Sequence, residues 1–410
     1  MSLSSCIRAT AFASAYAAIL SGCAGTTNPS APLQSFSSVR AVKPHATQAI
    51  QNIIVVLQQD RSFDNLFAGY PGADAPTSGK THDGKQVTLR SISLKTTPEC
   101  APSTNGSNFK TIYNDGKMNG WDLTDPKDPL CPYTRVARGD VAPYWQLARH
   151  YALGDHLFAS TRFGDFANGL YAIAGTSKIA ADTYAVGPPS REPWGCDAPP
   201  GTITPVLKNG RYEFGGPFPC FTQFRTIADL LDAASVGWNV YSDKDSLAFD
   251  PFDPIKNVRL GPDWKNDGRH PASAILSDLS GGTLRPVSFV VSPGDVSDFP
   301  GSAGGPKWIA QLVKAAQGSK YWQHVAIVVT WTSPASGRFY DNVPPAFLDQ
   351  IGLGFRVPLL VISPNVKPGE ISHTQYEFAS ILKFIETNWS LGSLGSTDER
   401  ANSIGDMFDR

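Results

Sequence analysis

The sequence carries little charge and no excess of either sign. Only 17% of its 410 residues are Asp, Glu, Lys or Arg, and 35 basic residues are balanced by 36 acidic ones. The chain has no run of like charge and no internal repeat. Because binding to the phosphates of DNA or RNA requires clustered Lys and Arg, the sequence argues against a nucleic-acid partner. The many glycines and prolines, 37 and 33, instead favour a loop-rich enzyme outside the cytoplasm.

Long apolar runs are also scarce, and the most informative one lies at the N-terminus. After Arg8 the sequence reads ATAFASAYAAILSGCAG, which is too short to span a bilayer as a mature helix and is typical of a signal peptide. Its end, Leu20-Ser21-Gly22-Cys23, resembles the bacterial lipobox, in which the cysteine becomes the lipidated first residue. We therefore predict a signal peptide over residues 1–22 and lipidation of Cys23, with an ordinary cleaved signal as the alternative.

The following stretch predicts how the protein is held at a membrane. Residues 23–48 are rich in Ser, Thr, Pro and Ala, which is typical of a flexible tether. Ala24 resembles the residue that directs lipoproteins to the outer membrane of Gram-negative bacteria. The N-terminus thus predicts an exported lipoprotein of the bacterial cell envelope, anchored in the outer membrane and facing the periplasm or the exterior.

Cysteine is rare, with six in the chain. Cys6 leaves with the signal peptide and Cys23 would carry the lipid, so four remain: Cys100, Cys131, Cys196 and Cys220. In an oxidising periplasm four cysteines suit two disulfides, for which three pairings exist. We favour Cys100–Cys131 and Cys196–Cys220, because each pair brackets a loop-rich insertion. A zinc site is the competing interpretation, but the spacings match no zinc-ligand pattern and no histidine lies beside the cysteines.

From residue 49 onward, buried apolar runs alternate with helical patterns, as in an α/β fold built on a mostly parallel sheet. The clearest strands are expected at 52–57, 286–291, 324–331 and 358–363. Helices are expected at 62–67, 142–151, 167–175, 225–234, 306–317 and 374–388. The stretch 185–223, rich in Gly and Pro, is expected to leave the sheet as a loop-rich inserted cap. We treat 49–410 as one α/β domain.

Two of the expected strands end in polar residues, where function tends to lie in such sheets. They read VVLQQDRSFD and VVTWTSPASGRFYDNVPP. With four further segments, they resemble the bacterial phosphoesterase family of phospholipases C and acid phosphatases. Those segments are NDGKMNGWD, LGDHLFASTRFGDFANGLYAIAGTS, RPVSFVVSPGDVSDFP and the C-terminal part from RVPLLVISP to IGDMFD. The resemblance covers about residues 50–409 and implies an alkaline-phosphatase-like fold, with helices flanking a mostly parallel central sheet.

The resemblance also implies a mechanism, and the sequence departs from it where the chemistry would occur. The family needs a hard divalent metal on oxygen ligands, a Thr or Ser nucleophile, and histidines that hold or protonate the leaving oxygen. The family's Glu-Asn pair at the first strand end is here Gln59-Asp60, and a later acidic pair is Thr332-Ser333. The nucleophile position aligns with Asp165. All five positions are therefore candidates for an altered site.

Histidine is lacking at most of the positions where the resemblance places it. The chain has seven histidines, but Phe299, Asn342 and Phe378 occupy family histidine positions, and only His373 stands where the family also shows one. Neighbouring scaffold residues such as Arg61 are kept. Substitution concentrated on the ligand positions indicates a metal site that has been dismantled or rebuilt.

The oxygen atoms of Gln59, Asp60, Asp165, Thr332 and Ser333 are chemically compatible with Mg²⁺ or Ca²⁺, and the site also fits a protein that binds no metal. A transition metal that needs imidazole ligands is disfavoured. The cofactor is therefore expected to be Mg²⁺, Ca²⁺ or none.

Each candidate also has an ordinary structural interpretation. Asp60 suits the N-cap of the helix that follows it, and Asp165 suits a turn. His373 can simply lead into the last helix. Asp298 and Asp341 are expected on loops, where carboxylates are usually solvated.

Two functions fit these observations. The first is an exported phosphate-ester hydrolase that works through an altered site, with Asp165 and His373 as its candidate catalytic residues. The second is a catalytically inactive binding module for a phosphorylated, lipid-headgroup or protein ligand. Because losing a nucleophile and a metal together leaves little beyond binding, the substitutions weigh against the family mechanism. A purely structural lipoprotein is the third alternative, and in each case we expect a monomer held at the membrane by its N-terminal lipid anchor.

Overall fold

The computed structural model describes residues 50–100, 106–243, 250–264, 269–335 and 337–409. The predicted signal peptide, the tether and Cys23 lie outside these residues. Within the described ranges, no helix combines the length and the apolar character needed to cross a membrane.

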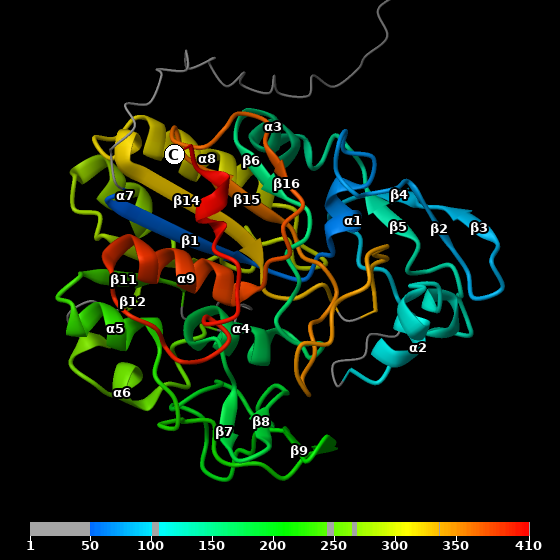
Figure 1. Ribbon diagram of the computed structural model, residues 1–410, viewed down its shortest axis with the longest axis horizontal. Coiled ribbons are helices and arrows are strands. Elements are labelled where there is room, and N and C mark those ends of the chain that lie inside the picture. Colours follow the sequence, from blue (N-terminus) through cyan, green and yellow to red (C-terminus); the bar gives the residue numbers. More distant parts are fainter. Residues whose placement is uncertain (1–49, 101–105, 244–249, 265–268, 336, 410) are drawn as a thin grey trace, which may run out of the picture. The chain divides into compact units, whose positions relative to one another are not determined.

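The main sheet has eight strands in the order β12-β11-β13-β1-β14-β15-β6-β16 (Figure 1). Among these strands, β15 alone runs antiparallel to its neighbours, and the other pairs are parallel. The expected α/β class with a mostly parallel sheet is confirmed. The strand bounds are β12 Arg269–His270, β11 Trp238–Tyr241, β13 Val287–Val291, β1 Asn52–Gln58, β14 Val325–Trp331, β15 Leu359–Ile362, β6 Ala152–Gly154 and β16 Ile371–Ser372.

The four strands expected from the sequence are β1, β13, β14 and β15, each within one or two residues of its predicted bounds. Strand β1 lies between β13 and β14 and is buried along its whole length. A parallel strand that is covered on both faces needs a continuous apolar run, and IIVVL (53–57) supplies one.

Helices cover both faces of this sheet (Figure 1). Helices α3, α7 and α8 lie on one face, where α8 packs against the other two, and α4, α5 and α9 lie on the opposite face. All six predicted helices are present, and α9 begins four residues later than expected. The bounds are α1 Phe63–Phe67, α2 Phe109–Tyr113, α3 Ala142–His150, α4 Asp165–Ala174, α5 Ile227–Ala233, α6 Lys256–Arg259, α7 Ala274–Gly281, α8 Gly305–Gln317 and α9 Phe378–Trp389.

The Gly- and Pro-rich stretch expected at 185–223 contains the hairpin β9 (Val206–Lys208) and β10 (Arg211–Glu213). The hairpin extends a separate antiparallel sheet, β10-β9-β8-β7, that starts earlier with β7 (Lys178–Ala180) and β8 (Thr183–Ala185). The side of this sheet that carries Leu207 packs on Phe163 and Ile351, close to the start of α4. The excursion is thus attached beside the N-terminus of that helix.

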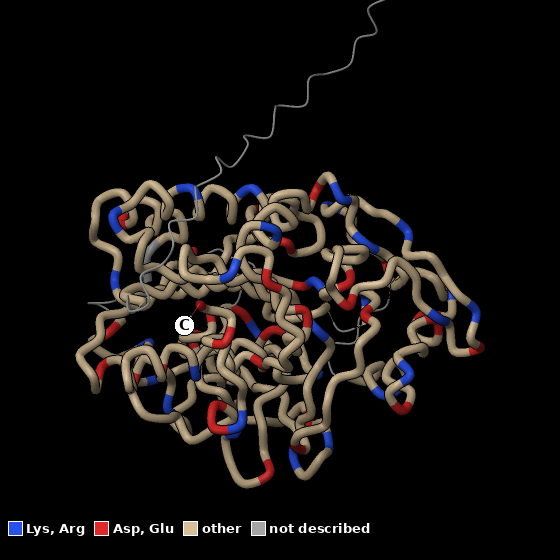
Figure 2. Tube along the Cα trace, turned by 45° about the horizontal axis from the view of Figure 1, so that its top comes forward, with Lys and Arg blue, Asp and Glu red and all other residues tan. Residues whose placement is uncertain are grey.

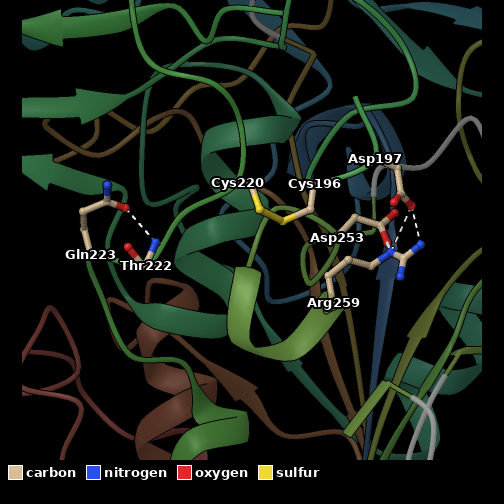
Figure 3. Close-up of a disulfide and its surroundings, with 7 residues drawn as sticks. All are labelled: Cys196, Asp197, Cys220, Thr222, Gln223, Asp253 and Arg259. Atoms are coloured by element: carbon tan, nitrogen blue, oxygen red, sulfur yellow. Dashed lines mark hydrogen bonds and ion pairs between the residues drawn. A yellow bond between two sulfur atoms is a disulfide. The ribbon is translucent and has the colours of Figure 1, made fainter. Parts of the chain in front are cut away.

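Both favoured disulfides are present, Cys100–Cys131 and Cys196–Cys220. The second joins two parts of the excursion to each other, next to the segment before α6 (Figure 3). The Cys196 N–H donates to the Asp253 carbonyl at 3.0 Å, and Arg259 of α6 forms an ion pair with Asp197. The Cys196–Cys220 disulfide and the Arg259–Asp197 ion pair therefore stabilise the same part of the excursion, next to α6.

A third group of short elements lies to one side of the main sheet (Figure 1). It contains the pairs β2–β3 (Ser78–Lys80 with Gln86–Thr88) and β4–β5 (Arg90–Ile92 with Thr134–Val136), and helix α2. Their shared core includes Trp121, Tyr133 and Tyr340. The backbone N–H of Tyr340 donates to Pro132 at 3.0 Å, so this group holds the loop that leaves β14.

Candidate functional site

The candidate site forms where β1 and β14 end side by side. These strands are parallel neighbours, so their carboxyl ends meet at one edge of the sheet. Two backbone hydrogen bonds join the segments beyond the strands: Thr332 N–H to the Gln58 carbonyl, and Arg61 N–H to the Ser333 carbonyl, both at 3.0 Å. Asp60 sits at the turn between them with a φ of +52°, a conformation that Asp tolerates better than most residues.

Four of the five candidate ligand positions come together here. Asp165 is the first residue of α4, and its carboxyl group accepts a hydrogen bond from the Thr332 hydroxyl. Asp60 lies close enough to the Ser333 hydroxyl and to the Asp165 carboxyl group for both to shift its pKa. Gln59 is buried next to them, but its side-chain Nε2 has no hydrogen-bond partner in the described structure.

Burial raises the pKa of both carboxyl groups of this Asp60–Asp165 pair. The negative charge of Asp60 raises the pKa of Asp165 further, to well above its ordinary range. At Asp60, the hydrogen bond from Ser333 and the positive charge of Arg338 oppose the effect of burial. The arrangement favours a neutral Asp165 that donates its proton to the Asp60 carboxylate.

The expectation that Asp60 caps the following helix is wrong. The N-cap of α1 is Ser62, whose side chain accepts a hydrogen bond from the Asn65 N–H. Asp60 lies two residues earlier and turns its carboxyl group toward Asp165 instead. Asp165 likewise begins a helix rather than sitting in an isolated turn.

The residues at the strand ends do not fit the hard divalent metal that the family resemblance implies. Such a cation needs several ionised oxygen ligands that are free to turn toward it. Here Asp165 already accepts a hydrogen bond from the Thr332 hydroxyl, burial and the charge of Asp60 raise its pKa and so oppose its ionisation, and Gln59 offers only an amide. In the part of the chain that the structure describes, no group of three or more His, Cys, Asp or Glu is arranged to hold a metal ion.

His373 lies at the same edge of the sheet but belongs to a different cluster. It follows β16, and Asp155 follows the parallel strand β6. His373 Nδ1 lies 2.9 Å from Asp155 Oδ2; the aspartate is fully buried, whereas the imidazole is 57% exposed. The carboxylate therefore orients the ring. Because the partner of His373 is Asp155, the structure does not bring the two candidate catalytic residues into contact.

Asp298 was expected on a solvated loop, and this expectation is wrong. Its side chain is fully buried and accepts hydrogen bonds from the Tyr144 hydroxyl at 2.8 Å and from Trp331 Nε1 at 2.9 Å. Burial raises the pKa of Asp298 to about 6, although the nearby Arg61 lowers it. Arg61, itself buried, donates from Nε to the Asp298 backbone carbonyl at 2.8 Å.

Asp341 is buried as well, contrary to expectation, because an arginine is buried with it. Arg356 Nε donates to Asp341 Oδ1 at 2.8 Å, and Arg356 Nη2 donates to Asp64 Oδ1 at 3.1 Å. All three side chains are fully buried, and the guanidinium lies over the Phe63 ring. This triad joins α1, the loop after β14 and the start of β15, so it is structural support for the site.

Sequence reasoning missed two residues that shape this edge. Arg338 lies close enough to Asp60 to lower its pKa, and the buried Nε of Arg338 has no hydrogen-bond partner in the described structure. A single arginine in a loop carries no signal in the sequence. Asp155 was the other; it follows the three-residue strand β6, which is too short to give a periodic signal in the sequence.

The chain matches the family model described as "Phosphoesterase family" over residues 50–392. A hemolytic phospholipase C of Pseudomonas aeruginosa is 23% identical over 435 residues, which cover 89% of this chain and 56% of that protein. Phospholipase C B of Mycobacterium tuberculosis is 22% identical over 431 residues, which cover 87% of this chain and 77% of that protein. The chain therefore spans little more than half the length of its Pseudomonas relative.

Among solved structures, the chain is similar to a protein in the alkaline phosphatase superfamily from Vibrio parahaemolyticus. That similarity has a TM-score of 0.39 and 11% identity, and it covers 89% of this chain and 73% of the other. The chain is also similar to murine ectonucleotide pyrophosphatase/phosphodiesterase 5, with a TM-score of 0.41 and 8% identity. That similarity covers 88% of this chain and 100% of the other. At such low scores these structures carry no argument about the site.

We predict that Asp165→Asn changes the free energy of unfolding by less than about 1 kcal/mol at pH 7. The amide keeps a donor for Asp60 and an acceptor for Thr332, as the neutral acid does. Asp165→Ala removes both and should cost about 2–3 kcal/mol. Urea unfolding of both variants measures these changes. A large loss of unfolding free energy in Asp165→Asn would show that the fold requires the ionised acid.

The pH dependence of stability tests the environment of Asp298. Its pKa is raised from 3.8 to about 6 in the folded state, so between these values the folded protein keeps a proton that the unfolded chain has released. The free energy of unfolding therefore falls as pH rises through this window, by about 3 kcal/mol in total.

Asp298→Asn lacks this titration and serves as the reference. The free energy of unfolding of the unmodified protein minus that of the variant should fall by about 3 kcal/mol from about pH 4 to about pH 7. Urea unfolding at a series of pH values measures it, and a difference that stays flat or rises would contradict the buried, raised pKa.

Proposed function

Because the chain belongs to the phosphoesterase family, we propose that it keeps the family's fold and the place of its site but has lost the metal-dependent hydrolysis. In this proposal it is a binding module for a phosphate ester or lipid headgroup at the bacterial cell envelope. One observation carries it: at the strand ends Asp60 and Asp165 lie next to each other, and the Thr332 hydroxyl already donates a hydrogen bond to Asp165 where the family resemblance places a metal.

The groups around the Asp60–Asp165 pair suit a ligand that carries one positive and one negative group. Asp60 offers a carboxylate, and Arg338 offers a guanidinium whose Nε lacks a protein partner in the described structure. The hydroxyls of Thr332 and Ser333 line the same strand end. A zwitterionic phosphate ester can place its phosphate on the arginine and its cation on the carboxylate. The relatives' names, phospholipases C, support this class of ligand.

Hydrolysis through Asp165 as a nucleophile is the second candidate, and family membership favours it. An aspartate can form an acyl phosphate, but only as the carboxylate. Burial and the Asp60 charge oppose ionisation of Asp165. Among the described residues, no histidine is in contact with Asp165, and His373 pairs with Asp155 instead. The chemistry therefore weighs against turnover.

The setting of this module is also part of the proposal. Two disulfides suit an oxidising compartment and support export. Lipidation at Cys23, the tether over 23–48 and an outer-membrane location rest on the N-terminal motif. The protein acts as a monomer on this account, with the lipid as its contact to the membrane.

The full chain should not hydrolyse p-nitrophenyl phosphate or p-nitrophenylphosphorylcholine above background, with or without Mg²⁺, Ca²⁺ or Zn²⁺. Calorimetry should instead show binding of phosphocholine, weakened roughly tenfold by Arg338→Ala because a charge-assisted hydrogen bond is lost. Arg211→Ala, an exposed arginine on β10, is the matched control and should bind normally. Metal-dependent turnover that disappears in Asp165→Ala would overturn the proposal in favour of a hydrolase.

Expression in a Gram-negative host with a labelled fatty acid tests the anchor. The chain should take up the label and sediment with outer membranes, and Cys23→Ala should do neither, because the acceptor thiol is gone. Lipidation at Cys23 would be contradicted if the Cys23→Ala variant took up the label. It would also be contradicted if the unmodified protein were cleaved but carried no label.

A further inference from the structure

The C-terminal end of α4 is held by the segment that follows α9. Helices α4 and α9 pack on each other on one face of the main sheet (Figure 1). Residues 391–398 then come back to the last turn of α4. There the Ser396 hydroxyl donates to the Ala174 carbonyl at 2.8 Å, and the Thr397 hydroxyl donates to the Gly175 carbonyl at 2.7 Å. These two bonds satisfy carbonyls that the end of a helix leaves without an intrahelical partner.

This segment is shaped by a buried carboxylate, Asp398, which is 1% exposed. The carboxyl group accepts hydrogen bonds from the Ser393 hydroxyl at 2.5 Å, the Leu394 N–H at 3.0 Å and the Ser396 N–H at 2.6 Å. Burial opposes the charge of Asp398, but the hydrogen bonds from Ser393 and Ser396 outweigh it and hold its pKa below the ordinary value. Asp398 is therefore ionised at neutral pH, and the turn depends on its charge.

A second carboxyl group, that of Glu386 in α9, lies beside the first and is 6% exposed. Glu386 Oε1 accepts a hydrogen bond from the same Leu394 N–H at 3.3 Å, so the two carboxyl groups share one donor. Two negative charges in so buried a place repel each other, and one N–H cannot neutralise both. Burial and the charge of Asp398 raise the pKa of Glu386 from 4.5 to about 7. Glu386 therefore keeps its proton in mildly acidic solution, where Asp398 is ionised.

Few other charges act on Glu386. Figure 2 shows Lys and Arg interspersed with Asp and Glu along the chain, so single neighbours matter more than a surface of one sign. Lys383 of the same helix lowers the pKa of Glu386, but its Nζ already donates to the carbonyls of Glu399 and Ala401. Among the described residues, the other charged groups on the packed elements are engaged elsewhere or remote: Arg400 pairs with Glu377 and Asp349, Asp406 accepts from Tyr376, and Asp165 lies at the opposite end of α4.

We propose that residues 391–398 form a pH-sensitive latch on α4, closed while Glu386 is protonated and loosened when Glu386 ionises beside Asp398. In the open latch Glu386 is an ordinary carboxyl group, so above pH 4.5 opening releases a proton that the closed latch retains up to about pH 7. The latch is therefore tightest in acid, weakens as the pH rises to about 7, and stays weakened above it.

The latch acts on the helix that begins with Asp165, one member of the strand-end pair. It does not depend on the proposed function, however, because every contact that forms it lies at the other end of α4. The latch would stand if the strand-end site bound nothing.

Hydrogen exchange of single amides in the full chain, followed by NMR, tests the latch. The protection factor compares the measured rate with that of an unfolded chain at the same pH, so it reports the opening itself. For the Leu394 and Ser396 amides it should fall roughly tenfold or more between pH 5 and pH 7. The amides of β14 report global unfolding, and their protection should fall less.

Glu386→Gln is the matched variant, because its amide is neutral at every pH and keeps an oxygen for the Leu394 N–H. Its protection factors should not change between pH 5 and pH 7. Ser396→Ala removes the hydroxyl bond to Ala174, so it should lower protection roughly fivefold at every pH and keep the pH dependence. A flat protection factor for Leu394 in the unmodified protein, or an equal slope in Glu386→Gln, would overturn the latch.

The carboxyl-carbon resonance of Glu386, assigned with the same variant, gives a second reading that does not depend on exchange. Its titration midpoint should lie near pH 7. A midpoint near 4.5, the ordinary value for a glutamate, would show that Asp398 does not oppose the ionisation of Glu386 and would overturn the proposal.

Discussion

The closeness of two carboxyl groups, the buried Asp60 and the partly buried Asp165, is the constraint on which this edge of the sheet depends. Two charges cannot both persist in such a place, so the pair must share a proton or find a cation. The protein supplies hydroxyls from Thr332 and Ser333 and the charge of Arg338. These groups stabilise one ionised carboxylate, and the other carboxyl group can remain neutral. We therefore propose that this pair does not require a divalent ion.

The scaffold around the pair is built on buried arginines. Arg61 ties the end of β1 to Asp298 and Leu94, and Arg356 ties Asp64 to Asp341. Removing one partner of such a buried charge costs far more than the pair contributes, so these residues tolerate little change.

The sequence predicted the structure correctly where a residue pattern is compatible with one kind of structure. The buried runs at β1 and β14 could only be covered strands, and both favoured disulfides formed. It failed where partners come from distant segments. Asp298 and Asp341 looked solvated because nothing near them in sequence revealed Arg61 or Arg356. The short strands β6 and β16 gave no periodic signal, so the Asp155–His373 contact was out of reach.

Infrared spectroscopy of the carboxyl groups can show whether Asp60 and Asp165 share a proton. In the spectrum of the unmodified protein minus that of Asp165→Asn, the shared proton predicts the C=O stretch of a protonated acid at neutral pH. Millimolar Mg²⁺ or Ca²⁺ should leave that band in place. If the difference spectrum shows only ionised carboxylate, or if either cation removes the band, the pair is a metal site and the account is wrong.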